Sequence, residues 1–127
     1  MSTIGLSVST TGSLGNAIGI VSGDTLARVF TLTQNGSAYN LTGVTSVTLR
    51  RKTHPYHNTD STDDLTGLLD ITSAAAGQVT LTPDSSYWSP YIDWYSIEFV
   101  VNTGSGIVTF PDPANGPFRV EIQKALT

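Results

Sequence analysis

The chain has 127 residues, a formal net charge of −4 and no cysteine. This length provides one hydrophobic core and leaves no room for a second. The absence of cysteine excludes disulfides, thiolate metal sites and cysteine nucleophiles, and the negative charge argues against binding to nucleic-acid phosphates.

The surface is expected to be polar but weakly charged. Charged residues make up 13% of the chain, against about 25% in typical domains. Ser, Thr, Asn and Gly therefore cover much of the surface, and such a surface repels neighbouring proteins weakly. This composition suits a protein that sits against other proteins.

Neither a membrane span nor an exported precursor is expected. No stretch approaches the roughly 18 apolar residues of a spanning helix. The N-terminus has neither the basic nor the apolar region of a secretory signal. We therefore expect a protein that is made in the cytoplasm without Sec export and has no membrane partner.

Residues 1–22 are rich in Ser, Thr and Gly, with scattered apolar side chains that include Ile4, Leu6 and Val8. Such a segment by itself buries too little apolar area to offset its conformational entropy. We predict an N-terminal arm, flexible or docked on a partner, with ordering against its own domain as the other option. Residues 23–127 form the folded domain.

Alternating apolar and polar residues predict the first strand of this domain from residue 25, with Leu26, Phe30 and Leu32 on one face. Asn-Gly within residues 34–37 tolerates the positive φ values of a tight hairpin, so residues 38–40 are expected to return beside the first strand.

The same alternation predicts the later strands, and Gly and Pro mark the turns between them. Residues 53–66 are mostly His, Pro, Asn, Ser, Thr and Asp and are expected to form an exposed loop. The expected strands cover 44–51, 68–71, 78–82, 93–101 with Tyr95, Ile97, Phe99 and Val101 inward, 107–110, and a last strand with Phe118, Val120 and Ile122.

Seven or eight short strands, separated by turns and without helical periodicity, favour an all-β immunoglobulin-like β-sandwich. A small barrel would show the same spacing, and the sequence alone does not separate the two.

The chain offers no convincing metal or catalytic constellation. His54 and His57, with Asp60, Asp63 and Asp64 nearby, have metal-ligating side chains, but a Pro-containing polar loop gives them no rigid scaffold. No serine stands in a Gly-x-Ser-x-Gly turn. We therefore predict no catalytic residues, no metal, no cofactor and no enzymatic activity.

An aromatic cluster between residues 87 and 95 is the most informative local feature. Tyr95 is expected in the core, while Trp88 and Tyr91 are expected at an interface or rim, where Trp and Tyr anchor protein contacts. With Tyr56 in the exposed loop and Ile4, Leu6 and Val8 of the arm, they are the candidate partner-binding residues. Alternatively, exposed rings stack on sugars, and a carbohydrate-binding module used in host-surface adsorption would use them in this way.

The chain resembles the N-terminal domain family of phage baseplate upper proteins, an immunoglobulin-like module, over about residues 20–124. The elements that carry the resemblance, in order, are GDT at 23–25, FTLT at 30–33, QNG at 34–36, YNLTG at 39–43, VTLR at 47–50, GQVTLT at 77–82, WYSIEF at 94–99, IVTFP at 107–111 and FRVEI at 118–122.

This resemblance implies a structural protein of a tailed-phage virion, made in the host cytoplasm, and carries over no catalytic residue. Baseplate upper proteins continue into a stalk, whereas this sequence stops at Thr127, so we expect a free-standing module. Its partners would be capsid proteins, as in decoration, or tail and baseplate proteins. A homo-oligomer is expected, with a trimer as one option, because linked copies bind a lattice more tightly.

Overall fold

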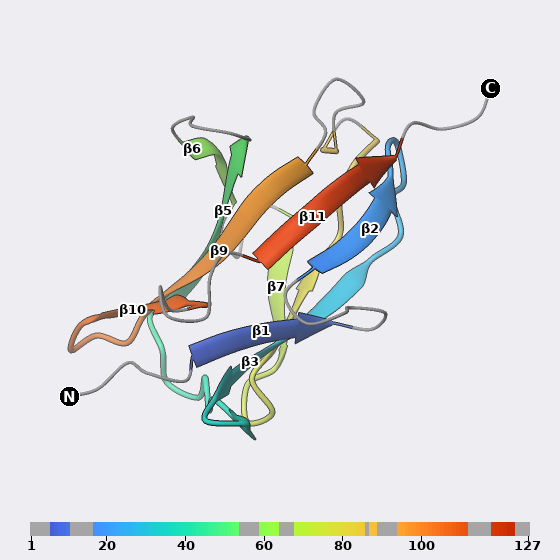
Figure 1. The fold of residues 1–127 in the computed structure, drawn as a ribbon. Coiled ribbons are helices and arrows are strands. Elements are labelled where there is room, and N and C mark those ends of the chain that lie inside the picture. The colour runs from blue at the N-terminus through green and yellow to red at the C-terminus, as the bar shows by residue number, and fades with distance from the viewer. Residues whose placement is uncertain are drawn as a thin grey trace.

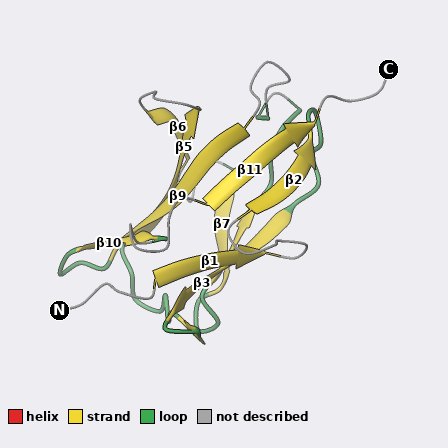
Figure 2. Ribbon diagram, viewed as in Figure 1, coloured by secondary structure: helices red, strands yellow, loops and turns green. Residues whose placement is uncertain are grey.

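The computed structural model describes residues 6–10, 17–53, 59–63, 68–85, 87–88, 94–111 and 118–123, with the backbone alone for residues 52–53 and 59–63. These residues form eleven strands and no helix (Figure 1, Figure 2). The strands are β1 (Leu6–Thr10), β2 (Ala17–Val21), β3 (Arg28–Gln34), β4 (Ser37–Ala38), β5 (Ser46–Thr53), β6 (Thr59–Asp63), β7 (Leu69–Ser73), β8 (Gln78–Leu81), β9 (Trp94–Asn102), β10 (Ile107–Phe110) and β11 (Phe118–Gln123).

The strands form two sheets. The smaller sheet has the order β1-β3-β8-β7, with the short β4 on β3, and all its pairs are antiparallel. The larger sheet has the order β2-β11-β9-β5-β6, with β10 on β9, and its β2–β11 pair is parallel. Strands β10 and β11 share one edge of β9, because β5 occupies the other edge along its length.

This topology is that of an immunoglobulin-like sandwich, as predicted. Immunoglobulin variable-type sheets have the orders A-B-E-D and G-F-C-C′. Here β1-β3-β8-β7 and β11-β9-β5-β6 follow these orders, and the chain visits them in the same sequence. The number of strands exceeds the expected seven or eight because β1 and β2 lie in the expected arm and β6 lies in the expected loop.

The prediction of an N-terminal arm is wrong for the described part of residues 1–22. β1 pairs with β3 and β2 pairs with β11, so the segment adds an edge strand to each sheet. Leu6 and Val8 are 1% and 2% exposed, and Ile18 and Ile20 are buried too. The other option, ordering against its own domain, is the one observed, because the alternating apolar side chains of the segment complete a core built by later strands.

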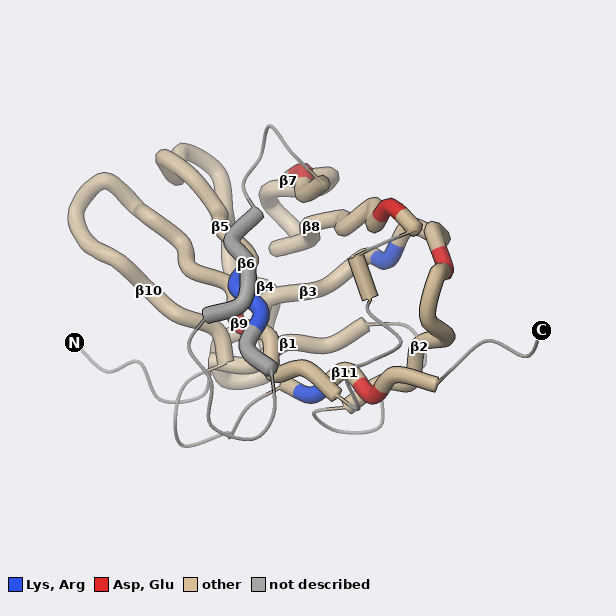
Figure 3. Tube along the Cα trace, turned by 90° about the horizontal axis from the view of Figure 1, so that it is seen from above, with Lys and Arg blue, Asp and Glu red and all other residues tan. Residues whose placement is uncertain are grey.

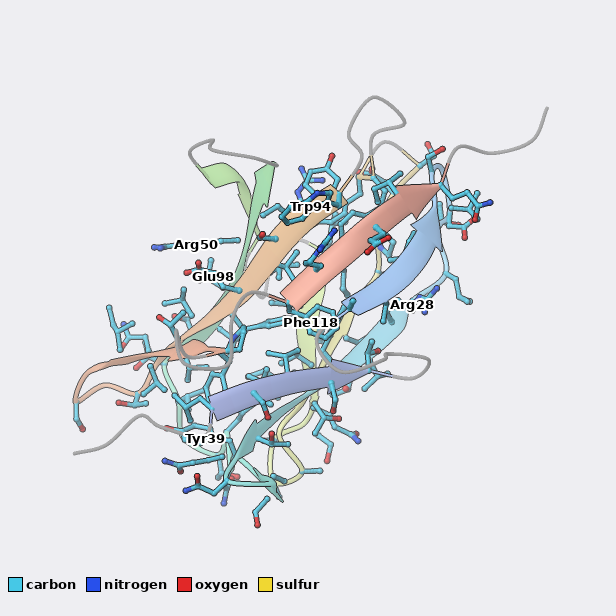
Figure 4. The ribbon with its side chains drawn as sticks, in the orientation of Figure 1. Arg28, Tyr39, Arg50, Trp94, Glu98 and Phe118 are labelled. Carbon is cyan, nitrogen blue, oxygen red and sulfur yellow. The ribbon has the colours of Figure 1, made fainter. Side chains whose placement is uncertain are left out.

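The core lies between the sheets and is rich in phenylalanine. The Phe30 ring of β3 lies 5.2 Å from the Phe99 ring of β9 and 6.0 Å from the Phe118 ring of β11, measured between centroids. Figure 4 shows Phe118 at the start of β11. The residues predicted to point inward from β9 are buried, which confirms its orientation: Tyr95, Ile97, Phe99 and Val101.

Two local predictions differ from the structure. β3 begins at Arg28, and Leu26, predicted on its inward face, precedes it and is 70% exposed. Within the expected loop 53–66, residues 59–63 form β6, which pairs with β5. A strand made only of polar residues shows no hydrophobic alternation, so the sequence pattern does not predict it. It can still form, because backbone hydrogen bonds to a neighbouring strand edge are enough.

The Asn-Gly turn is confirmed. Asn35 and Gly36 have φ values of 53° and 85°, and β3 pairs with β4 directly across them. Both positive values match the tight hairpin that Asn-Gly favours.

Replacing Leu6 by alanine tests whether β1 belongs to the fold. Leu6→Ala should lower the free energy of unfolding by about 2–5 kcal/mol, as for other buried leucines. Ser9→Ala is the matched control on the exposed face of β1 and should change it by less than about 0.5 kcal/mol. Denaturant unfolding measures both, and equal stabilities of the two variants would show that β1 is a detached arm after all.

Gly77 is required by close backbone packing at the turn before β8. Its φ is +68°, and a Cβ there would lie 2.6 Å from the Leu32 carbonyl oxygen and 2.7 Å from that of Tyr39. Gly77→Ala should therefore cost more than about 2 kcal/mol in thermal or denaturant unfolding. Gly19→Ala in β2 is the control, because its Cβ meets nothing within 4 Å. It should leave stability unchanged or raise it by up to about 1 kcal/mol.

Candidate protein-binding surfaces

The aromatic cluster forms part of the core. Trp88 is 1% exposed, and its ring lies edge-on at 4.7 Å from Tyr87 and 5.4 Å from Tyr95 between centroids. The prediction that Trp88 lies at a rim is therefore wrong, whereas Tyr95 is buried as predicted. The indole Nε1 is buried and has no hydrogen-bond partner in the described structure.

Arg51 packs against the aromatic cluster. Its guanidinium lies 3.9 Å from the Tyr87 ring centroid and 5.0 Å from that of Tyr95, and it donates a hydrogen bond to the Tyr87 carbonyl oxygen. Arg50 and Arg51 are neighbours in sequence, but strand alternation separates their side chains: Arg51 shares the inward side of β5 with Leu49, and Arg50 points outward. That alternation was the available signal for the role of Arg51.

The other candidate residues divide between the core and undescribed segments. Leu6 and Val8 are buried and unavailable to a partner. Ile4, Tyr56 and Tyr91 lie outside the described residues, as do His54 and His57. The described part of the chain contains no group of His, Asp and Glu side chains arranged to hold a metal. Nor does it include a helix long and apolar enough to cross a bilayer.

Two ion pairs lie on the outer face of the larger sheet among the side chains that the structure describes. Arg50 Nη1 of β5 lies 3.9 Å from Glu98 Oε2 of β9, and Arg119 Nη2 of β11 lies 3.5 Å from Glu121 Oε2. The Arg119 guanidinium also lies 4.2 Å from the centroid of the half-buried Trp94 ring. Figure 4 shows Arg50 beside Glu98 and Trp94 farther along β9. Exposed pairs of this kind contribute only about 0–1 kcal/mol to stability.

The outer face of the smaller sheet is different, because it carries hydroxyl side chains and almost no charge. In Figure 3 the strands β1 and β8 have no charged residue along their length. Asp70 of β7 is the charged residue at its rim. This hydroxyl face consists of Ser7, Ser9, Val29, Thr31, Thr33, Thr72, Gln78 and Thr80, all half-buried or exposed.

Several hydroxyl groups on this face already bond to one another. The Ser7 and Thr33 hydroxyls form a hydrogen bond between β1 and β3. Thr72 Oγ1 and Thr80 Oγ1 lie 3.0 Å apart between β7 and β8. A polar group that is already bonded can be covered at lower cost than an unbonded one.

Comparison with known proteins does not assign this chain to a family. No family model and no curated protein matches this chain. A solved structure of murine CRIg is similar, with 13% sequence identity, a TM-score of 0.49, and coverage of 95% of this chain and 98% of that chain.

Two substitutions of Trp88 test its place in the core. Trp88→Ala should lower the free energy of unfolding by about 3–5 kcal/mol. Trp88→Phe keeps most of the ring contacts and removes the unbonded N–H, whose burial costs about 1–3 kcal/mol. Its free energy of unfolding should therefore fall by at most about half as much as that of Trp88→Ala. Guanidinium unfolding followed by circular dichroism measures both, and losses under about 0.5 kcal/mol for both would place Trp88 at the surface.

Proposed function

We propose that this protein is a non-enzymatic docking module of a tailed-phage virion that binds capsid proteins or tail and baseplate proteins through the hydroxyl face. The observation that carries the proposal is the near absence of charge on this face together with its hydrogen-bonded hydroxyl pairs.

Low charge matters because the centres of protein interfaces are depleted of charged residues. Covering an unpaired charge or an unbonded hydroxyl removes it from water without compensation. On the hydroxyl face, bonded pairs already tie β1 to β3 and β7 to β8. Val29, which is 41% exposed, adds apolar area between them. A flat partner surface therefore covers this face at low desolvation cost.

The virion setting is supported by the sequence resemblance over residues 20–124. A repeated protein lattice also suits a flat polar face, because many weak contacts together give stable attachment. We propose that the protein is made in the host cytoplasm, joins the virion without a cofactor, and has neither membrane nor nucleic acid as partner.

The absence of catalysis is supported by the surroundings of the acidic residues. Glu98 and Glu121 lie in ion pairs on an open sheet face, and catalysis would need a nucleophile, a base and a third orienting group together. The carbohydrate-binding alternative loses its main residue, because Trp88 is buried beneath Tyr87 and Tyr95. We therefore favour protein docking.

Placing a lysine at the centre of the hydroxyl face tests the proposal. Thr31→Lys should weaken binding to phage particles that lack the protein, or to separated capsids and tails, by at least about tenfold, or about 1.4 kcal/mol. The added charge loses its hydration in the interface without gaining a partner. Co-sedimentation measures the affinity, and cryo-electron microscopy shows whether capsid or tail gains ordered density.

Ser105→Lys is the control, because it adds the same charge in the exposed turn between β9 and β10. It should bind like the unmodified protein, and circular dichroism should show that both variants are folded. Undiminished binding of Thr31→Lys would exclude the hydroxyl face as the docking surface. If the unmodified protein binds neither capsids nor tails, the virion role itself is wrong.

A further inference from the structure

Among the side chains that the structure describes, the outer face of the larger sheet carries a diagonal row of four charges that alternate in sign. The row runs from Glu121 and Arg119 on β11 to Glu98 on β9 and Arg50 on β5. The exposed fractions of these side chains are 59%, 43%, 25% and 46% in that order. Each charge is therefore accessible to another molecule.

Strand register fixes the geometry of this row. Glu121 pairs with Trp94, Arg119 with Ser96, and Arg50 with Glu98. From Arg119 to Glu98 the step is therefore one strand across and two residues along. From Glu121 to Arg50 it is two strands across and four residues along, and the two steps run in the same direction.

A row with these signs is complementary to itself. Consider a second copy related by a two-fold axis that lies between the two faces, perpendicular to the row and through its middle. The order of the charges in the row of the second copy is then reversed relative to the first. Each negative charge then faces a positive one: Arg119 faces Glu98 of the second copy, and Glu121 faces its Arg50. A two-fold interface needs this property, because residue i contacts j while j contacts i.

The surroundings of the row suit close approach. Beside the row, Ala17 and Gly19 on β2 and Ser96 on β9 are small, and a Cβ at Gly19 would meet nothing within 4 Å. The Arg119 guanidinium is already stacked on Trp94, so little side-chain freedom is lost when it binds a carboxylate. Trp and Arg are also the residue types that most often dominate binding energy at interfaces.

We propose that this protein forms a two-fold homodimer through the outer face of its larger sheet, with Arg119 of each copy paired with Glu98 of the other. The inference goes beyond the docking function, because it concerns the opposite face of the sandwich. It specifies a dimer instead of the trimer considered from the sequence.

Charge reversal tests the pairing. In a dimer of Arg119→Glu, the new carboxylate of each copy would face Glu98 of the other copy, so two pairs of carboxylates would repel each other. This substitution should weaken self-association on the order of a hundredfold. Glu98→Arg should weaken it similarly, by opposing two guanidinium groups. An equimolar mixture of the two variants should associate, because the substituted position 119 of one variant meets the substituted position 98 of the other. Sedimentation velocity over a concentration series measures all three.

Arg28→Glu is the control, since it reverses the same charge at the start of β3, in the other sheet. It should dimerise like the unmodified protein, and circular dichroism should show that every variant is folded. The proposal is overturned if the unmodified protein is monomeric up to about 1 mM or forms a trimer. Dimers of Arg119→Glu alone, or the failure of the mixture to associate, would also overturn it.

The two proposals fail separately. Thr31→Lys should still dimerise, because its substitution lies on the other sheet. A protein that dimerises but binds no virion part would disprove only the docking function. A protein that binds virion parts as a monomer would disprove only the dimer.

Discussion

The contact of Phe30 with Phe99 and Phe118 holds the two sheets together, and the arrangement of the other strands follows from it. Phe30 belongs to the strand equivalent to B and Phe99 to the strand equivalent to F. In antibody domains a disulfide joins these two strands, but this chain has no cysteine. Here ring packing joins them, and it fixes which side of β3, β9 and β11 faces inward. Because side chains alternate along a strand, the same contact determines which residues reach each outer surface.

The two outer surfaces therefore differ for one geometric reason. The residues that alternate with Phe30 on β3 are Val29, Thr31 and Thr33, which leaves the middle of the smaller sheet's outer face without charge. The residues that alternate with Phe99 and Phe118 include Glu98 and Arg119, which gives the larger sheet its charges. A slip of one residue would expose phenylalanine in each of these strands, and in β9 and β11 it would also bury charges, so the difference between the faces is as strongly determined as the core.

The sequence allowed most of the sheet interior to be predicted, because β5, β8 and β9 alternate clearly and end at turn residues. It did not reveal β1 and β2, since each is five residues long and pairs with a distant segment, as in Leu6 with Gln34 and Ala17 with Arg119. Trp88 lies outside any strand, and its burial depends on Tyr87 and Tyr95 packing around it. The charge row could not be predicted either, because its order requires the register between three strands.

The position of the two faces on opposite sides of the sandwich restricts how the proposed functions combine. A dimer formed through the charged faces directs its two hydroxyl faces away from each other, because each lies on the far side of its own core. Such a dimer does not place both hydroxyl faces on one flat lattice. It can instead hold two partner surfaces apart and join them, with one hydroxyl face on each. If both proposals hold, the geometry therefore favours a connector between two virion components over a decoration lying on the capsid alone.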